Sequence, residues 1–387
     1  MIDTDNSALR AAKPEALKSL QVLRAIAAVS VVYYHIGALP SFGSFGVDIF
    51  FVLSGFVIAM VLAKGQSPSV FAASRLIRVV PLYWLLTSCL FLIALLAPEL
   101  LNSTTANLYN YAKSLFFIPY FKENGTLRPL LAVGWTLNYE MFFYLCIWLS
   151  ILLTRRYYLQ LSALLVLAAY GLWGQNTQDP EISVFLRNTQ LLEFLLGILV
   201  FKLYTARWPA ALRRLPVPLA AALGGVCYLF MAAAEATALQ LNGLLIYGLP
   251  SALLLLALLS LEGYFSRSSS PAVRCWTGMG DASYATYLSH FYVVELIRKI
   301  AFQRFHLINP YTPLGVALVL AASLLLGYAL YRFIDRPLLR FLKARLMHRR
   351  ATPGAGENAG LVAAHLKALP PEAHPKPARP PRPAPQG

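Results

Sequence analysis

The chain has 387 residues, of which 58% are hydrophobic and only 13% are charged. This composition, with a mean hydropathy of +0.58, excludes a soluble globular domain of this length and indicates a polytopic membrane protein. The net charge of +16 comes without any nucleic-acid motif, so it points to a membrane surface and not to nucleic acid. The four cysteines show no metal-ligand spacing, and no metal site is expected.

Ten apolar stretches of the chain are long enough to cross a bilayer as helices. They lie at residues 19–39, 46–63, 77–98, 132–153, 158–174, 186–204, 216–234, 242–261, 282–302 and 313–334. Because a lipid-exposed backbone must satisfy its own hydrogen bonds, the expected fold is an all-α, polytopic transmembrane bundle of about ten helices.

Basic residues fall in every second loop between these stretches. They are Lys13, Lys18, Lys64, Arg75, Arg155, Arg156, Arg207, Arg213 and Arg214. Cytoplasmic loops carry the excess of Lys and Arg, so both termini are expected in the cytoplasm. The connections at 99–131 and 303–312 also hold basic residues and fit this arrangement less well.

The same pattern divides the chain into three segments. Residues 1–18 are expected to form a cytoplasmic N-terminal segment, and residues 19–345 the transmembrane domain. The last segment, 346–387, is rich in proline and basic side chains and cannot bury a core. A disordered, Pro-rich basic tail is therefore expected there.

The first apolar stretch contains two strongly polar side chains, Arg24 and His35. On a helix they lie only about 20° apart around the axis and about 16 Å apart along it. Ionisable groups at membrane depth are costly, so this shared face predicts a functional site. The alternative is that Arg24 extends to the inner surface and that His35 is a hydrogen-bonded core residue.

Two carboxylates are candidate partners for His35. The hairpin between the first two stretches turns near residues 42–43, which places Asp48 at a depth similar to that of His35. Glu140 reaches a depth within about two helical turns of His35 from the fourth stretch. Either carboxylate could hold the imidazole in one tautomer and leave its other nitrogen to accept a hydroxyl proton. The choice between them stays open.

Arg75 and Arg78 lie three residues apart at the cytoplasmic entry to the third stretch. On one helix face they could clamp the phosphates of a nucleotide-bearing donor. From their spacing alone, such arginines are more often ordinary anchors at the cytoplasmic surface of the membrane. His290, in the ninth stretch, is expected about 12 Å in from the cytoplasmic side, below His35, as a tunnel-lining or structural residue.

Five short strings occur in order along the chain. They are LRAIAAVSVVYYH (23–35), FGVDIFFVLSGFVIA (45–59), RLIR (75–78), WTLNYE (135–140) and SYATYLSHFYVV (283–294). Together they resemble the acyltransferase 3 family of integral-membrane O-acyltransferases, and most closely its exopolysaccharide-acetylating branch. The resemblance runs from about residue 18 to about residue 340 and implies a ten-helix bundle in the bacterial inner membrane.

The resemblance also implies a reaction. Its acyl donor would be a cytoplasmic acyl-CoA, usually acetyl-CoA, bound as a substrate and not as a tightly held cofactor. The acceptor would be a hydroxyl of an exopolysaccharide or other cell-surface glycan. The Arg-x-x-Arg of the family is implicated in coenzyme A binding, which favours a donor-binding role for Arg75 and Arg78, with Arg24 along the pantetheine arm.

These observations predict a membrane O-acetyltransferase in which His35 is the general base and Asp48 and Glu140 complete the catalytic set. Expected partners are acyl-CoA, a glycan acceptor, the bilayer and proteins of polysaccharide synthesis. One alternative is a proton-coupled transporter that uses the same buried charges as a relay. Another is a non-catalytic scaffold of a polysaccharide-export complex, which would leave the two arginines without a ligand.

Overall fold

The computed structural model describes residues 17–101, 104–206 and 215–351. These residues form helices and connecting loops, with no β-strand among them and one isolated bridge between Phe121 and Leu127. The all-α prediction is confirmed. The chain divides into two compact units at Arg340 and Phe341, and the described part of the second unit is the end of one helix.

Each of the ten predicted stretches contains helix. The helices concerned are α2 (Lys18–Ile36), α3 (Gly46–Leu62), α4 (Pro68–Leu96), α6 (Trp135–Leu153), α7 (Tyr158–Ala168), α10 (Gln190–Thr205), α11 (Val217–Ala236), α12 (Leu249–Ser260), α15 (Ser283–Leu296) and α16 (Pro313–Leu330). Within the described ranges, six helical segments are long and apolar enough to cross a membrane. Two shorter ones, at Gly46–Leu62 and Leu244–Ser260, are also apolar. A multi-pass bundle is therefore confirmed, while the count of ten stays a prediction.

Shorter elements connect or extend these helices. They are η2 (Pro98–Leu100), α5 (Leu108–Leu115), η3 (Ala132–Gly134), η4 (Ala169–Trp173), α8 (Gly174–Asn176), α9 (Pro180–Leu186), η6 (Leu244–Gly248), α13 (Glu262–Arg267), α14 (Pro271–Asp281), η7 (Ile297–Arg304), η8 (Tyr331–Asp335) and α17 (Arg336–Ala351). Four of them, η4, η6, η7 and η8, are π-helical turns. Such turns change the direction in which side chains leave a helix and are frequent at functional sites.

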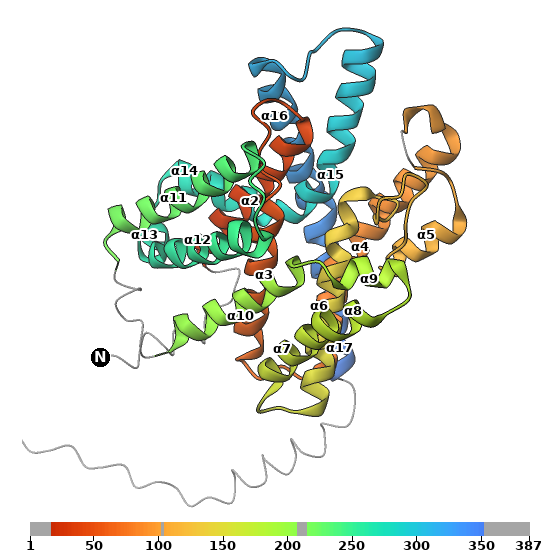
Figure 1. Ribbon diagram of the computed structural model, residues 1–387. Coiled ribbons are helices and arrows are strands. Elements are labelled where there is room, and N and C mark those ends of the chain that lie inside the picture. Colours follow the sequence, from red (N-terminus) through yellow and green to blue (C-terminus); the bar gives the residue numbers. More distant parts are fainter. Residues whose placement is uncertain (1–16, 102–103, 207–214, 352–387) are drawn as a thin grey trace, which may run out of the picture. The chain divides into compact units, whose positions relative to one another are not determined.

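Helix α3 is the central helix of the first unit. It is apolar on nearly all of its faces, as expected of a helix surrounded by protein, and it packs against α2, α10 and α12 (Figure 1). Its contact with α10 is a backbone contact. A Cβ atom on Gly55 would lie 2.0 Å from the carbonyl oxygen of Phe194, and one on Gly197 would lie 2.0 Å from that of Val52. Only glycine allows so close an approach.

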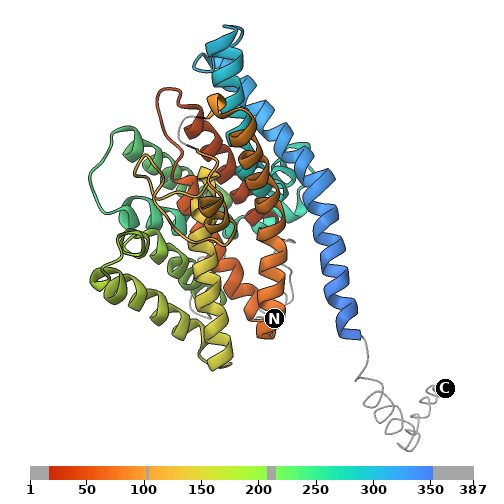
Figure 2. The same ribbon diagram turned by 90° about the vertical axis from the view of Figure 1, so that its right-hand side faces the viewer.

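Helices α4, α6 and α15 build the side of the bundle that faces α3. Helices α4 and α6 run alongside each other in Figure 2 and are in contact. Tyr284 of α15 donates its hydroxyl hydrogen to the carbonyl oxygen of Val79 in α4, at 2.6 Å. This hydrogen bond joins two helices that are far apart in the sequence.

The C-terminal end of the last apolar helix differs from the simplest expectation. Pro337 would be expected to end a helix, because it has no backbone N–H and its ring clashes with the preceding turn. The chain instead passes through the π-helical turn η8 and continues as α17 to Ala351. The wider π-helical turn just before Pro337 disrupts the regular hydrogen-bond ladder, which lowers the cost of the missing donor. The predicted tail beyond this helix, 352–387, and most of the N-terminal segment, 1–16, lie outside the described residues.

Candidate active site

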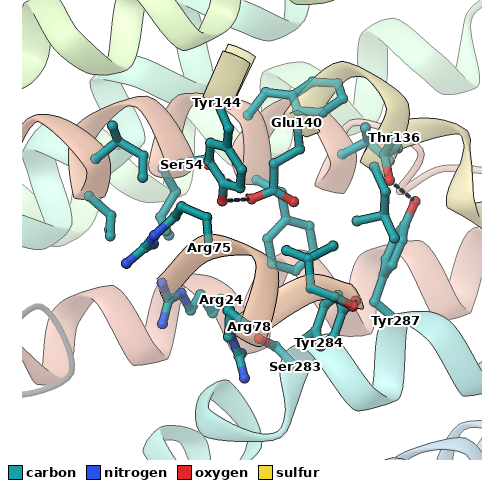
Figure 3. Close-up of a pocket in the computed structure, with 18 residues that line it drawn as sticks. Arg24, Ser54, Arg75, Arg78, Thr136, Glu140, Tyr144, Ser283, Tyr284 and Tyr287 are labelled. Carbon is teal, nitrogen blue, oxygen red and sulfur yellow. Dashed lines mark hydrogen bonds between the residues drawn. The ribbon is translucent and has the colours of Figure 1, made fainter. Parts of the chain in front are cut away.

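A cavity of about 130 Å³ lies between α2, α3, α4, α6 and α15. The three arginines proposed from the sequence, Arg24, Arg75 and Arg78, all line it, together with Glu140. Figure 3 shows the three guanidinium groups gathered on one side of the pocket, with Thr136 and Tyr287 on the other. Residues separated by more than 100 positions in the chain therefore meet in one pocket, in which three guanidinium groups lie among mostly apolar side chains.

The three arginines are held in different ways. Arg24 Nη1 donates to the side-chain oxygen of Gln21 at 3.4 Å. Arg78 forms an ion pair with the buried carboxylate of Asp335 at 3.1 Å, and its guanidinium lies 5.1 Å from the ring centroid of Tyr284. Asp335 belongs to the π-helical turn η8. Arg75 is bound more loosely, with its Nε 3.4 Å from the Ser74 hydroxyl oxygen.

Glu140 is part of the arginine pocket and not a partner of His35. Its carboxylate accepts hydrogen bonds from the hydroxyl of Ser54, at 3.2 Å, and from the hydroxyl of Tyr144. Tyr144 is one helical turn further along α6, so it can reach back to the same carboxylate. The expected hydrogen bond between Glu140 and His35 is absent from the described residues, because both carboxylate contacts of Glu140 lie inside the pocket.

Asp48 does not orient His35 either. Its carboxylate accepts a long hydrogen bond, 3.5 Å, from the amide nitrogen of Gln190 at the start of α10. Asp48 is buried at the face of α3 that packs against α10, whereas His35 lies on α2. Asp48 and His35 therefore lie on helix faces that do not meet, although their predicted depths in the bundle are similar. Among the described residues no hydrogen bond joins Asp48 to His35, and the catalytic role assigned to Asp48 stays a prediction.

A backbone carbonyl fixes the tautomer of His35. Its Nδ1 lies 2.9 Å from the carbonyl oxygen of Val31, one turn earlier on α2. A carbonyl only accepts, so Nδ1 carries the hydrogen and the Nε2 of the neutral ring keeps its lone pair. His35 is half-buried, and it does not line the arginine pocket. Arg298 donates to the backbone oxygen of His35 at 3.1 Å and pairs with Glu295 at 3.2 Å.

His290 lies beside His35, not below it, which corrects the expectation from the sequence. The two ring centroids are 4.9 Å apart. In the structure α14 already packs against α2 before α15 begins, and a Cβ on Gly280 would lie 1.9 Å from the carbonyl oxygen of Gln21. Helix α15 follows this contact directly, and its packing against α2 brings His290 next to His35.

Several pocket residues were not predicted from the sequence. They are Ser54, Thr136, Tyr144, Ser283, Tyr284 and Tyr287. A signal was present for some of them. Tyr284, Tyr287 and His290 follow one another at three-residue spacing, which places them along one face of a helix. Ser54 is a polar residue within the otherwise apolar run from Ile49 to Leu62.

The arrangement can bind an elongated anion at one end and accept a proton at the other. Tyr287 connects the two regions, because it lines the arginine pocket and its ring centroid lies 6.0 Å from that of His290. Within the described part of the chain, no group of three or more His, Cys, Asp and Glu side chains is placed to hold a metal ion.

Comparison with known proteins identifies the family. Residues 17–332 match the family described as an acyltransferase domain. The exopolysaccharide production protein ExoZ of Rhizobium meliloti is 30% identical over 307 residues, which cover 78% of this chain and 92% of that protein. No solved structure matches the chain.

Two further relatives are named for peptidoglycan. The putative peptidoglycan O-acetyltransferase YrhL of Bacillus subtilis is 26% identical over 357 residues, and the peptidoglycan O-acetyltransferase OatA of Listeria monocytogenes is 25% identical over 356 residues. Each alignment covers 83% of this chain and 55% of the relative, so the chain spans about half the length of these two proteins. With the family match over most of its length and its apolar helical bundle, the chain belongs to the acyltransferase 3 family and is a multi-pass membrane acyltransferase.

Proposed function

We propose that this protein is an O-acetyltransferase that moves an acetyl group from cytoplasmic acetyl-CoA to a hydroxyl of an exopolysaccharide or other cell-surface glycan. The observation that carries the proposal is the convergence of Arg24, Arg75 and Arg78 on one pocket. Guanidinium groups bind phosphates through paired hydrogen bonds, and three of them suit a donor that carries several phosphates. In the proposal, the phosphates of coenzyme A lie at the arginine side and the thioester points toward Tyr287.

His35 is the general base of the proposed reaction. Its Nδ1 is hydrogen-bonded to the Val31 carbonyl, which leaves Nε2 to accept the proton of the acceptor hydroxyl. As this O–H bond breaks, the oxygen attacks the carbonyl carbon of the thioester. The C–S bond then breaks, its electron pair stays on sulfur, and the products are an acetyl ester and coenzyme A. Glu140, hydrogen-bonded to Ser54 and Tyr144, lines the donor side.

The glycan acceptor is supported by the relatives. One is named for exopolysaccharide production and two for O-acetylation of peptidoglycan. We favour an exopolysaccharide because the alignment with the first covers 92% of that protein. In this proposal the protein lies in the bacterial inner membrane with both termini in the cytoplasm, receives its donor from inside and its acceptor from outside, and works beside polysaccharide-synthesis proteins.

The proposal is tested with purified protein in lipid nanodiscs. The donor is acetyl-CoA, and the acceptor is surface polysaccharide from cells that lack this chain. Release of the coenzyme A thiol should depend on the polysaccharide.

The role of His35 is tested in the same assay. Because a positioned general base contributes roughly 10²–10⁴-fold to the rate, His35→Ala and His35→Gln should lower the rate by this factor while acetyl-CoA still binds. His306→Gln, at an exposed histidine outside the pocket, serves as the control and should keep the parental rate. An inserted H35A protein with the parental rate would refute the mechanism.

A further inference from the structure

The imidazole of His290 is fully buried and only partly hydrogen-bonded. Its Nδ1 lies 3.2 Å from the carbonyl oxygen of Thr286, one turn earlier on α15, so this nitrogen carries the hydrogen of the neutral ring. Its Nε2 is buried and has no hydrogen-bond partner among the described residues. A buried acceptor without a partner costs free energy, and such an atom in a native protein calls for an explanation.

The only other imidazole close to this nitrogen in the described part of the chain belongs to His35. The two ring centroids are 4.9 Å apart and the ring planes meet at 61°. Each ring uses its Nδ1 for a carbonyl of its own helix, so Nε2 is the nitrogen that each ring has left for another partner. In the resting state both Nε2 atoms are acceptors, and no hydrogen bond can form between them.

A proton on His35 changes this relationship. Once its Nε2 carries a hydrogen, that N–H can donate to the lone pair of His290 Nε2. A hydrogen bond from a charged donor is about twice as strong as a neutral one, and the effect is greatest where water is excluded. The two rings therefore complement each other only after one of them has taken a proton.

We propose that His290 is a positioning residue for the acetyl transfer, and that its Nε2 accepts a hydrogen bond from the imidazolium of His35. This inference rests on the proposed role of His35 as the base. The acceptor hydroxyl loses its proton to His35 Nε2 as the oxygen bonds to the thioester carbon and the C–S bond breaks. His290 stabilises this proton on His35 until it passes to the thiolate of coenzyme A, which leaves as the thiol and returns both rings to their neutral state.

The charged groups around the pair do not provide this acceptor. Arg128 and Arg298 both act on His35 as positive charges, and the guanidinium of Arg298 is engaged with Glu295 and the backbone oxygen of His35. Helix α16 packs against both α2 and α15 and has no Asp, Glu, Lys, Arg or His between Pro313 and Leu330. The positive charges near His35 offer it no hydrogen-bond acceptor, whereas the Nε2 of His290 does.

Two substitutions separate this role from simple packing. His290→Phe keeps a flat ring but removes the acceptor, whereas His290→Gln offers an amide oxygen that can accept the hydrogen bond. We expect H290F to lower kcat by at least about tenfold without changing the KM for acetyl-CoA, and H290Q to keep more activity than H290F. If His290 only fills space, Phe should be the better replacement, and that order would overturn the proposal.

The pH profile gives a second readout in the same assay with acetyl-CoA and surface polysaccharide. Loss of the acceptor makes a proton on His35 less favourable, so the acidic limb of the kcat profile should move to lower pH in H290F. An unchanged acidic limb of the kcat profile together with an unchanged kcat would refute the inference.

Ser289→Ala, at a neighbouring buried residue of α15, controls for damage to the helix and should leave both the kcat and its pH profile unchanged. If H35A keeps full activity the proposed role of His35 as the base fails, whereas an inactive H35A beside a normal H290F refutes only the role of His290.

Discussion

Arg75 and Arg78 are three residues apart on α4 and line the same pocket, yet their surroundings differ. Arg78 is paired with the buried carboxylate of Asp335, so removing its side chain leaves a buried charge without its partner. Arg75 forms no ion pair within the described residues; its Nε lies 3.4 Å from the Ser74 hydroxyl oxygen, and its guanidinium lies 6.0 Å from the ring centroid of Phe71. The contribution of Arg75 to stability is therefore small, which leaves its guanidinium available for a ligand.

We expect Arg75→Ala to weaken acetyl-CoA binding by roughly 1.5–3 kcal/mol, the scale of a charge-assisted hydrogen bond, with little change in melting temperature. Arg75→Lys should recover only part of the affinity, because an ammonium cannot make the paired contact. Arg78→Ala should lower both affinity and melting temperature. Arg274→Ala, at an exposed arginine outside the pocket, is the control. If calorimetry gives the same acetyl-CoA affinity for R75A and the parent protein, Arg75 does not bind the donor and is an ordinary positive-inside anchor.

Lys122, in the loop between α4 and α6, explains why this basic loop departs from the positive-inside pattern. Its ammonium is buried and donates to the hydroxyl of Thr104 and to the carbonyl of Leu130, both at 3.1 Å. Lys113 in the same connection pairs with Glu181 at 3.6 Å. These two charges are engaged locally, so they say little about the side of the membrane on which the loop lies.

Burial lowers the pKa of Lys122 to about 8 from the usual 10.5. Between these two values the unfolded chain binds more protons than the folded protein, so the free energy of unfolding should rise with pH from about 8 to about 10.5. The full shift corresponds to at most about 3 kcal/mol. Lys122→Met should remove this part of the rise, measured as the difference in melting temperature between variant and parent across the pH series. A constant difference would contradict the assignment.

At the level of helices, α3 and α10 depend on each other through the contact at Gly55 and Gly197. A methyl group at either position would have to displace a backbone carbonyl and not a flexible side chain. Helix α3 carries Ser54, Val57 and other pocket residues, so a shift of this contact would also move the donor site. The close approach of these two helices is therefore part of the support of the active site.

Gly197→Ala should lower stability by about 1–3 kcal/mol, the usual cost of overpacking, and should also reduce transfer. Gly225→Ala provides a matched control, because Gly225 is also a helical glycine but nothing lies within 4 Å of a Cβ placed there. It should be neutral or slightly stabilising, since alanine is the better helix former. Thermal unfolding in nanodiscs measures both variants, and equal melting temperatures for the two would show that α3 and α10 can separate at little cost.

For the whole molecule, the open question is its orientation in the membrane. The loop pattern predicts that both termini and α14 face the cytoplasm. Cys275 lies in α14, is exposed, and has no disulfide partner, so it reports directly on this prediction. In a chain that keeps Cys275 as its single cysteine, a membrane-impermeant maleimide should label the protein only after the cells are permeabilised. Labelling of intact cells would place α14 outside and reverse the proposed directions of donor and acceptor.

Sequence alone determined the class of the molecule and supplied the candidate residues of its site. Apolar length and composition require a helical membrane bundle, because a backbone in lipid must satisfy its own hydrogen bonds. Charged and titratable side chains are rare at membrane depth, so Arg24 and His35 stood out without any structure. The grouping of Arg24 with Arg75 and Arg78 was predicted only through the resemblance to the acyltransferase 3 family, because spacing alone favours ordinary membrane anchors for Arg75 and Arg78.

Tertiary structure alone decided which side chains meet. Helical spacing gives the depth and face of a residue on its own helix, but the rotation of one helix against another depends on packing between them. For this reason Glu140 joins the arginines, Asp48 meets Gln190, and His35 has His290 and not a carboxylate as its neighbour. The proximity of His290 to His35 likewise depends on how α15 packs against α2, which no count along the chain could supply.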